Sequence, residues 1–206
     1  MQWRKDYPPG ETMCCRSAFT NWLVDVKTKE KKALKLPANH AVGDWSRDGK
    51  HFLTTAYERK QGPTARLYLM NRDGTEARAL TDGTRPAFMG RLSPDSRKVL
   101  YLGPDPERKG KSRGANFGLF VLDVQTRKSR RVEQQPLNGE FQGFSWSPDG
   151  KRIAYAWRQV HEKVAPDQRT ESYQVVADAD GKNPVTIATE TGDSAGLITI
   201  GGVDWR

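Results

Sequence analysis

Short runs of alternating apolar and polar residues recur along the chain, and turn-forming segments separate them. Around residues 144–157 the apolar side chains occupy every second position: Phe144, Trp146, Ile153, Tyr155 and Trp157. Spacing of two places side chains on one face of a β-strand. Between the two runs, Pro148 fixes φ near the value for the first central position of a tight turn, and Gly150 tolerates a positive φ. The stretch therefore predicts a β-hairpin.

The same strand–turn–strand unit is repeated. Copies begin at Trp45, Leu92 and Trp146, and each contains Ser, a variable residue, Asp, Gly or Ser, and then a basic residue. Each copy leads into another apolar strand. Val203–Arg206 matches the first half of a further copy, and the segment from Trp3 to Cys15 is a degenerate one. A repeat of roughly 40–60 residues with several strands in each copy is the signature of a β-propeller.

We therefore predict an all-β fold in which each blade has four antiparallel strands, named a to d from the inside outward. The chain forms a single propeller domain over residues 1–206. Its expected blades are 1–36 (partial or degenerate), 42–82, 88–133 and 142–189, with a closing or incomplete strand at 197–206. The long b–c loops, expected at 57–65, 103–116 and 158–170, share one face of the disc with the d–a connections. No stretch has the sustained i, i+3, i+4 apolar pattern of a helix.

The anchors read W-S-x-D-G-K before an apolar strand, and residues 67–75 read L-Y-L-M-N-R-D-G-T. In these motifs the chain resembles the WD-repeat-like propeller repeats of TolB-type proteins, over residues 19–206. The resemblance implies a fold and leaves function open, because this repeat serves many purposes. Propellers of that family usually have six or seven blades. Either the chain is a closed four-bladed ring, or it is the C-terminal part of a larger propeller or a chain that must self-associate through its open edge. We favour the second interpretation because four blades are the lower limit.

Composition bounds the partners. The 206 residues carry a formal net charge of +9, which favours acidic partners in general. No apolar run approaches the roughly 20 residues of a membrane-spanning helix. The first residues, Met1–Asp6, lack the apolar region of a secretory signal. The resemblance implies relatives that are often periplasmic, which leaves a truncated precursor as an alternative, so we predict no compartment.

Two short motifs suggest chemistry, but each is better explained by a turn or loop. Gly192–Gly196 matches the G-x-S-x-G nucleophile elbow, yet a β-rich segment follows it and all three histidines precede it, so we expect a blade-to-blade loop. Asp178–Asn183 superficially matches a calcium loop, but its spacing is wrong, and we expect a hairpin turn. Cys14 and Cys15 are adjacent and are expected on opposite faces of a strand. We predict no catalytic residue, no metal ligand and no cofactor, with a cation in the central channel left as an alternative.

These observations favour a non-catalytic module that binds a protein or peptide through the face carrying the b–c and d–a loops. The candidate contact residues are the basic side chains of those loops: Arg59, Lys60, Arg108, Lys109, Lys111, Arg113, Arg158 and Lys163. One alternative is the propeller part of a hydrolase or peptidase. The other is binding of an acidic polymer through the basic loops. Nucleic acid is a poor fit because the basic runs at 108–113 and 127–131 are expected on opposite faces of the disc.

Overall fold

A computed structural model describes residues 21–37, 39–58, 64–108, 116–160 and 169–193, and no α-helix occurs in these segments. Their strands form three four-stranded antiparallel sheets and one two-stranded sheet. The first blade comprises β3 (His40–Trp45), β4 (His51–Glu58), β5 (Thr64–Asn71) and β6 (Arg78–Ala79). The second comprises β7 (Phe88–Leu92), β8 (Lys98–Pro104), β9 (Phe117–Asp123) and β10 (Ser129–Arg131). The third comprises β11 (Glu140–Trp146), β12 (Arg152–Val160), β13 (Arg169–Asp178) and β14 (Val185–Asp193).

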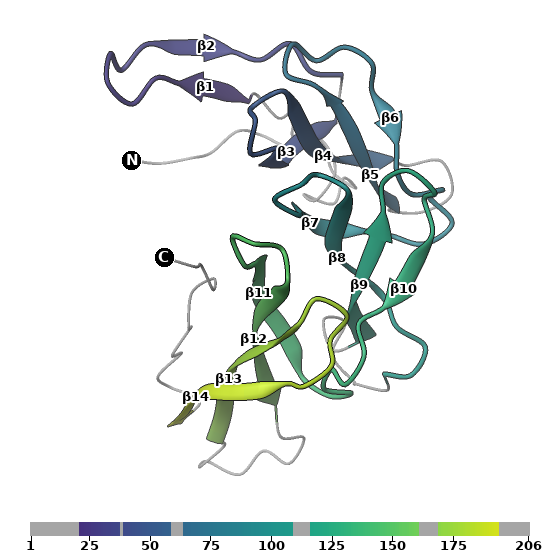
Figure 1. The fold of residues 1–206 in the computed structure, drawn as a ribbon, viewed down its shortest axis with the longest axis vertical. Helices are drawn as coiled ribbons and strands as arrows, with labels where there is room; N and C mark the ends of the chain where they lie inside the picture. Colours follow the sequence, from purple (N-terminus) through teal and green to yellow (C-terminus); the bar gives the residue numbers. More distant parts are fainter. Residues whose placement is uncertain (1–20, 38, 59–63, 109–115, 161–168, 194–206) are drawn as a thin grey trace, which may run out of the picture.

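The three blades stand side by side along an arc, as Figure 1 shows, with the inner strands β3, β7 and β11 on its concave side. The described sheets do not close into a ring. The predicted all-β propeller architecture is thus confirmed, and the arrangement is that of a partial propeller.

The hydrophobic core lies between neighbouring blades, because each blade buries the apolar face of its central strands against the next. Leu53 and Leu67 of the first blade pack with Val99 of the second. Leu100 and Leu119, which point to the opposite face of the second blade, pack with residues of the third, such as Ile153 and Tyr155. The alternation seen in the sequence therefore supplies two apolar faces to the second blade, one for each neighbour.

The two-stranded sheet, β1 (Trp22–Val24) and β2 (Lys31–Ala33), has the turn of an outer c–d hairpin. The Asp25 Oδ1 atom accepts bonds from the amides of Lys27 and Thr28, and Lys29 has a φ of 63°. In the c–d turn of the second blade, Asp123 Oδ1 likewise accepts bonds from the amides two and three positions later. Arg127, the counterpart of Lys29, has a φ of 58°.

The packing of β2 also indicates that the β1–β2 sheet is the outer hairpin of a blade. A Cβ atom on Gly181, in the c–d turn of the third blade, would collide with the carbonyl oxygen of Glu133, two residues past the end of β10. A Cβ atom on Gly74, in the c–d turn of the first blade, would collide with the carbonyl oxygen of Lys35, two residues past the end of β2. The β1–β2 sheet is therefore the outer hairpin of a blade that precedes the first full one.

Several expected loops are shorter than the sequence suggested, because strands extend into them. β4 and β5 pair as far as Glu58 and Thr64, within the loop expected at 57–65. β12 and β13 continue into the region expected as a loop at 158–170, and they pair as far as Val160 and Thr170. β14 runs to Asp193, so Gly192 lies in a strand and not in the expected blade-to-blade loop. Residues 185–191 are rich in threonine and β-branched side chains, which favour an extended strand over a loop. Ser194 lies outside the described residues.

Candidate functional site

The repeated anchor segments form the turns between strands a and b, and their polar side chains are used within those turns. The hydroxyls of Ser46, Ser93 and Ser147 each donate a 2.6 Å bond to the aspartate two positions later. Each hydroxyl also accepts a 2.9 Å bond from the amide that begins strand b. The serine bonds hold the pKa of Asp48, Asp95 and Asp149 below the ordinary value. These bonds stabilise the turn, which explains why the serine and aspartate recur in the motif.

A chain of hydrogen bonds connects the inner strands of the three blades. A carboxylate oxygen of Asp44 on β3 accepts a 2.8 Å bond from the amide of Leu92 on β7. In return, the Arg91 guanidinium donates a 2.8 Å bond to the carbonyl of Gly43. The indole nitrogen of Trp146 on β11 donates a 3.0 Å bond to the carbonyl of Arg91. The inner strands are thereby held at fixed distances from one another.

The a–b pairing is irregular in each of the three blades. Extra residues interrupt the register between Val42 and Asp44, between Phe88 and Arg91, and between Phe141 and Gly143. Such bulges redirect the side chains that follow them. In the first two blades these are Asp44 and Arg91, whose side chains make the inter-blade bonds.

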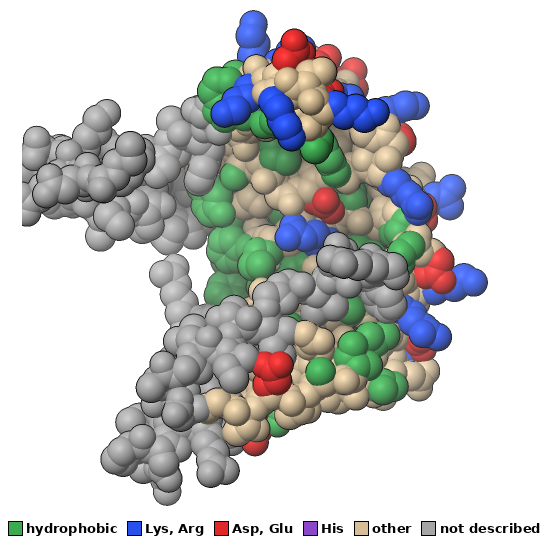
Figure 2. All heavy atoms as spheres, turned by 90° about the vertical axis from the view of Figure 1, so that its left-hand side faces the viewer, with side chains coloured by type: hydrophobic (Ala, Val, Ile, Leu, Met, Phe, Trp, Pro, Cys, Tyr) green, Lys and Arg blue, Asp and Glu red, His purple; other side chains and the backbone are tan. Residues whose placement is uncertain are grey.

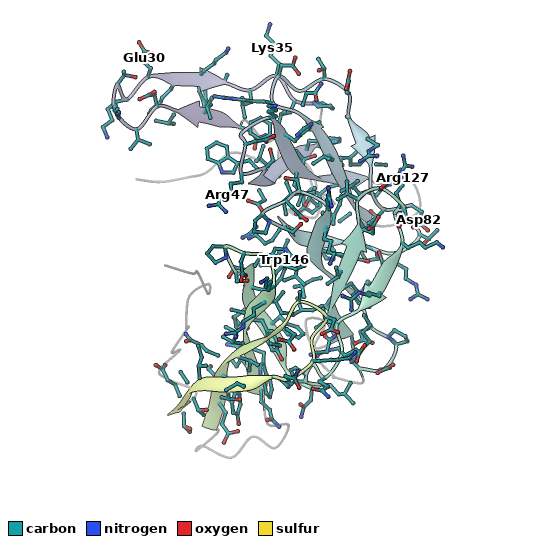
Figure 3. The ribbon with its side chains drawn as sticks, viewed as in Figure 1. Glu30, Lys35, Arg47, Asp82, Arg127 and Trp146 are labelled. Carbon is teal, nitrogen blue, oxygen red and sulfur yellow. The ribbon has the colours of Figure 1, made fainter. Side chains whose placement is uncertain are left out.

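An open groove of about 820 Å³ lies along these inner strands and their turns. Trp45 and Met89 project into it and are 56% and 43% exposed, whereas the indole of Trp146 is buried. Arg47 spans the groove, because its guanidinium donates a 3.2 Å bond to the carbonyl of Pro148 on the third blade. Figure 2 views the molecule from this open side, where hydrophobic side chains gather beside basic and acidic ones. Figure 3 labels Arg47 of the first blade and Trp146 of the third on the concave side of the arc.

The groove carries two guanidinium groups and one half-buried carboxyl group, that of Asp44. Burial raises the pKa of Asp44, although the bond from the Leu92 amide and the Arg91 charge oppose the shift. Two arginines beside an exposed tryptophan and a methionine form a composition that is enriched at protein interfaces. Such a surface can hold an extended peptide by apolar contact and by bonds to its carbonyl or carboxylate oxygens.

Of the eight basic residues predicted from the sequence, the structure describes the side chains of two, and these lie near each other. Arg108 is 4% exposed. Its guanidinium donates to the carbonyls of Pro136 and Gly139 and lies 5.1 Å from the centroid of the Phe141 ring. Arg108 therefore attaches the b–c segment of the second blade to the connection into the third, and this burial withdraws it from the binding surface that we expected it to supply.

Arg158 is half-buried and pairs with Glu140 at 3.0 Å. Both arginines thus make contacts within the protein at the junction of the second and third blades. The other six predicted residues, Arg59, Lys60, Lys109, Lys111, Arg113 and Lys163, lie outside the described residues.

The remaining motifs have local explanations where the structure describes them. Asp178–Asn183 forms a c–d hairpin turn, as expected, with Asp180 accepting a bond from the Lys182 amide. His40 is buried against Thr54, with 2.9 Å between the ring nitrogen Nδ1 and the hydroxyl oxygen. Among the described residues, no group of three or more His, Cys, Asp or Glu side chains is arranged to hold a metal ion. No helix in that part of the chain is long and apolar enough to span a membrane.

Sequence reasoning missed the inner groove, although the repeat contains a signal for it. The residue just before each anchor is Asp44, Arg91 or Ser145, so this position varies in character while the turn beside it is kept. A variable position next to a repeated structural turn is where a repeat protein differs from blade to blade. The groove lies on the inner side of that position.

Comparisons with known proteins bear on the fold. No protein-family model matches the sequence, and no curated protein matches it significantly. An oligogalacturonate lyase from Vibrio parahaemolyticus superposes with a TM-score of 0.53 at 15% identity, over 84% of this chain and 48% of that one. The tricorn protease superposes with a TM-score of 0.53 at 11% identity, over 82% of this chain and 20% of the protease chain. TolB from Acinetobacter baumannii superposes with a TM-score of 0.49 at 16% identity, over 84% of this chain and 49% of the TolB chain.

The superpositions on the lyase and the protease therefore agree with the β-propeller fold expected from the repeats. TolB is also among the solved structures to which this chain is similar. The chain spans about half the length of the TolB and lyase structures. At these identities the likeness concerns the fold alone.

Proposed function

We propose that this chain is a non-catalytic propeller module that binds a protein or peptide segment. The segment lies along the inner groove and extends toward the face that carries the b–c and d–a loops. The observation that supports this proposal is the pairing of exposed Trp45 and Met89 with Arg47 and Arg91 in one open groove. Aromatic and arginine side chains provide much of the binding energy at protein interfaces.

The rigidity of the groove supports the same function. Its walls are inner strands joined by the bonds of Asp44, Arg91 and Trp146 to neighbouring blades. A preorganised surface loses little conformational entropy when a partner binds. By contrast, the polar side chains of the anchors are engaged in their own turns. The hydrolase alternative therefore has no supporting side-chain arrangement among the described residues.

Selection of peptides from a phage-displayed random library tests the proposal. Peptides selected on the wild-type chain should bind the double variant Trp45→Ala/Arg47→Glu at least about tenfold more weakly, because an aromatic anchor and a charge-assisted contact are both lost. Binding should also change the fluorescence of exposed Trp45. The readouts are fluorescence titration and mass spectrometry of the recovered peptide.

A matched control is Trp22→Ala/Arg97→Glu, which removes an exposed tryptophan and reverses an exposed arginine outside the groove. This control should bind the selected peptides as the wild type does. Equal loss in both double variants would reject the groove as the site. Cleavage of the recovered peptides by the purified chain would reject the non-catalytic assignment.

A further inference from the structure

A second hollow lies on the outer side of the molecule, between the first and second blades. It has a volume of about 540 Å³ and is lined by β6, the connection from β6 to β7, and the facing strands β8 and β9. The outermost strand of the first blade, β6, is only two residues long and contributes Ala79 to the lining. We call it the outer cleft. Figure 3 places two of its residues, Asp82 and Arg127, together on the side opposite Arg47 and Trp146.

The floor of the outer cleft is apolar and aromatic. The rings of Tyr101 and Phe120 lie 5.7 Å apart between centroids, and Leu80 and Leu122 complete the lining beneath them. The Tyr101 hydroxyl donates a 3.0 Å bond to Ser129 Oγ, which fixes the ring in place. This floor can accept one apolar or aromatic side chain of a ligand.

The wall of the cleft is a short connection held in one conformation. Its first amide, that of Leu80, donates a 2.8 Å bond to the carbonyl of Leu67, and its last, that of Ala87, donates one of 2.8 Å to the carbonyl of Ala65. Between them, the Asp82 carboxylate accepts bonds from the amide and hydroxyl of Thr84. The wall is therefore preorganised.

The charge around the cleft is predominantly positive. Arg66, Arg85 and Arg127 line it, against the single carboxylate of Asp82. Arg66 donates from two guanidinium nitrogens to the carbonyl of Thr81, each at 3.3 Å, so its charge is held at the cleft wall. The Thr84 bonds lower the pKa of Asp82, which keeps that carboxyl ionised at neutral pH. Three guanidinium groups and one carboxylate leave a formal surplus of two positive charges.

We propose that the outer cleft binds an acidic peptide segment in which a carboxylate side chain neighbours an apolar or aromatic one. The apolar side chain lies on the Tyr101–Phe120 floor, and the carboxylate pairs with Arg85 and Arg127 at the rim. A pocket of this size lies in the usual range of about 300–1,000 Å³ for ligand sites. This site is separate from the inner groove and does not depend on the function proposed for it.

Nucleic acid fits the same cleft less well. A phosphate backbone needs a continuous stripe of positive charge, whereas these arginines line one local cleft that also contains the Asp82 carboxylate. Peptide binding tolerates that carboxylate because a backbone amide can donate to it.

The test uses the full chain and a fluorescein-labelled, end-capped peptide of alternating Glu and Phe, with the Gln–Phe peptide as its neutral counterpart. Fluorescence anisotropy should show binding of the acidic peptide, about tenfold or more weaker binding of the neutral one, and weakening with added salt. Arg85→Gln/Arg127→Gln and Arg85→Glu/Arg127→Glu should reduce the affinity in that order. Both arginines are exposed, so these changes leave the fold intact.

The matched control is Arg72→Glu/Arg97→Glu, which gives the same net charge from exposed turn residues outside the cleft. It should bind the acidic peptide as the wild type does. Equal affinity for the Glu and Gln peptides would overturn the proposal, as would equal loss in the control, which would indicate general electrostatic attraction. Tighter binding of a labelled oligonucleotide, abolished by the same cleft variants, would assign the site to nucleic acid instead.

Discussion

Ser96 occupies a backbone position that glycine holds in the two sister turns. Its φ is 58°, close to the 69° of both Gly49 and Gly150. The substitution we noted in the second anchor therefore leaves the backbone of the turn unchanged and places a β-carbon in the left-handed region, where L-residues are disfavoured.

We expect Ser96→Gly to raise the free energy of unfolding by about 0.5–1 kcal/mol, since relief of the left-handed strain outweighs the greater entropy of unfolded glycine. The reverse change, Gly49→Ser, should lower the free energy of unfolding by a similar amount through the same backbone strain. A Cβ atom at Gly49 meets open space, so no steric clash adds to that cost. Urea denaturation monitored by tryptophan fluorescence measures both. A destabilising Ser96→Gly would mean that the serine makes a contact of its own.

Asp44 offers a second prediction at this scale, because its carboxyl group is half-buried while it accepts the Leu92 amide bond. Asp44→Asn keeps an acceptor and removes the charge, so it should be neutral or stabilising at pH 7. Asp44→Ala leaves the buried amide of Leu92 without its partner and should cost about 1–3 kcal/mol.

The pH dependence follows from the direction of the shift. A carboxyl whose pKa is raised by folding favours the folded state most when it is protonated, and this contribution is lost as the pH rises through the folded pKa. Any advantage of Asp44→Asn at pH 7 should therefore shrink as the pH falls toward 4 and below. Urea denaturation of the wild type and Asp44→Asn at several pH values measures this difference in stability. If the stability gained by Asp44→Asn increased on acidification, folding would not raise the pKa of Asp44.

At the scale of the element, a glycine in the c–d turn of the first and third blades approaches the preceding blade closely. Gly74 and Gly181 have φ values of 88° and 91°, and both lie where a Cβ atom would collide with a carbonyl oxygen. Gly49 has a similar positive φ but open space beside it.

Gly74→Ala and Gly181→Ala should therefore each cost more than about 2 kcal/mol, while Gly49→Ala should cost about 1 kcal/mol from the backbone alone. Denaturant unfolding separates the three. For Gly74→Ala, hydrogen exchange at the amides of β1 and β2 should rise first, since that hairpin loses its contact. Uniform exchange across all blades in this variant would argue against the assignment of β1–β2 as a blade's outer hairpin.

The elements that sequence reasoning recovered are those determined by local contacts. The Ser147–Asp149 bond, the tight turn and the period-two spacing all lie within a few residues of one another, so the sequence predicts them directly. The burial of Arg108 could not be predicted, because it depends on the carbonyls of Pro136 and Gly139 on the next connection. The groove and the outer cleft likewise require the spacing between blades, which is set by packing between residues far apart in the chain.

At the scale of the whole molecule, Trp146 joins the third blade to the second. Its indole is 7% exposed and donates to the carbonyl of Arg91. Trp45 occupies the same position in the first blade and is 56% exposed. The repeated tryptophan thus has two roles. In the third blade it makes a buried contact with the neighbouring blade, and in the first blade it forms part of the exposed surface.

Trp146→Phe should cost about 2 kcal/mol, since the Arg91 carbonyl loses its donor and the smaller ring leaves space in the core. Trp45→Phe should change stability by less than about 0.5 kcal/mol, because that side chain is largely exposed. Calorimetry measures the stability of both variants. In a hydrogen-exchange experiment on Trp146→Phe, the amides of β12 and β13 should exchange earlier than those of the second blade. Equal effects of the two changes would mean that Trp146 does not couple the blades.

The glycine contacts at Gly74 and Gly181 also bear on the order in which the chain folds as it is synthesised. The outer hairpins β1–β2 and β9–β10 are each contacted by a turn that belongs to the following blade, so the ribosome makes that turn later than the hairpin. At ordinary rates of translation, the residues of one blade take on the order of seconds to appear. Each of these two hairpins therefore spends that interval without its contact to the following blade. During synthesis, the newest hairpin is the part of the chain most open to a chaperone or to a neighbouring nascent chain.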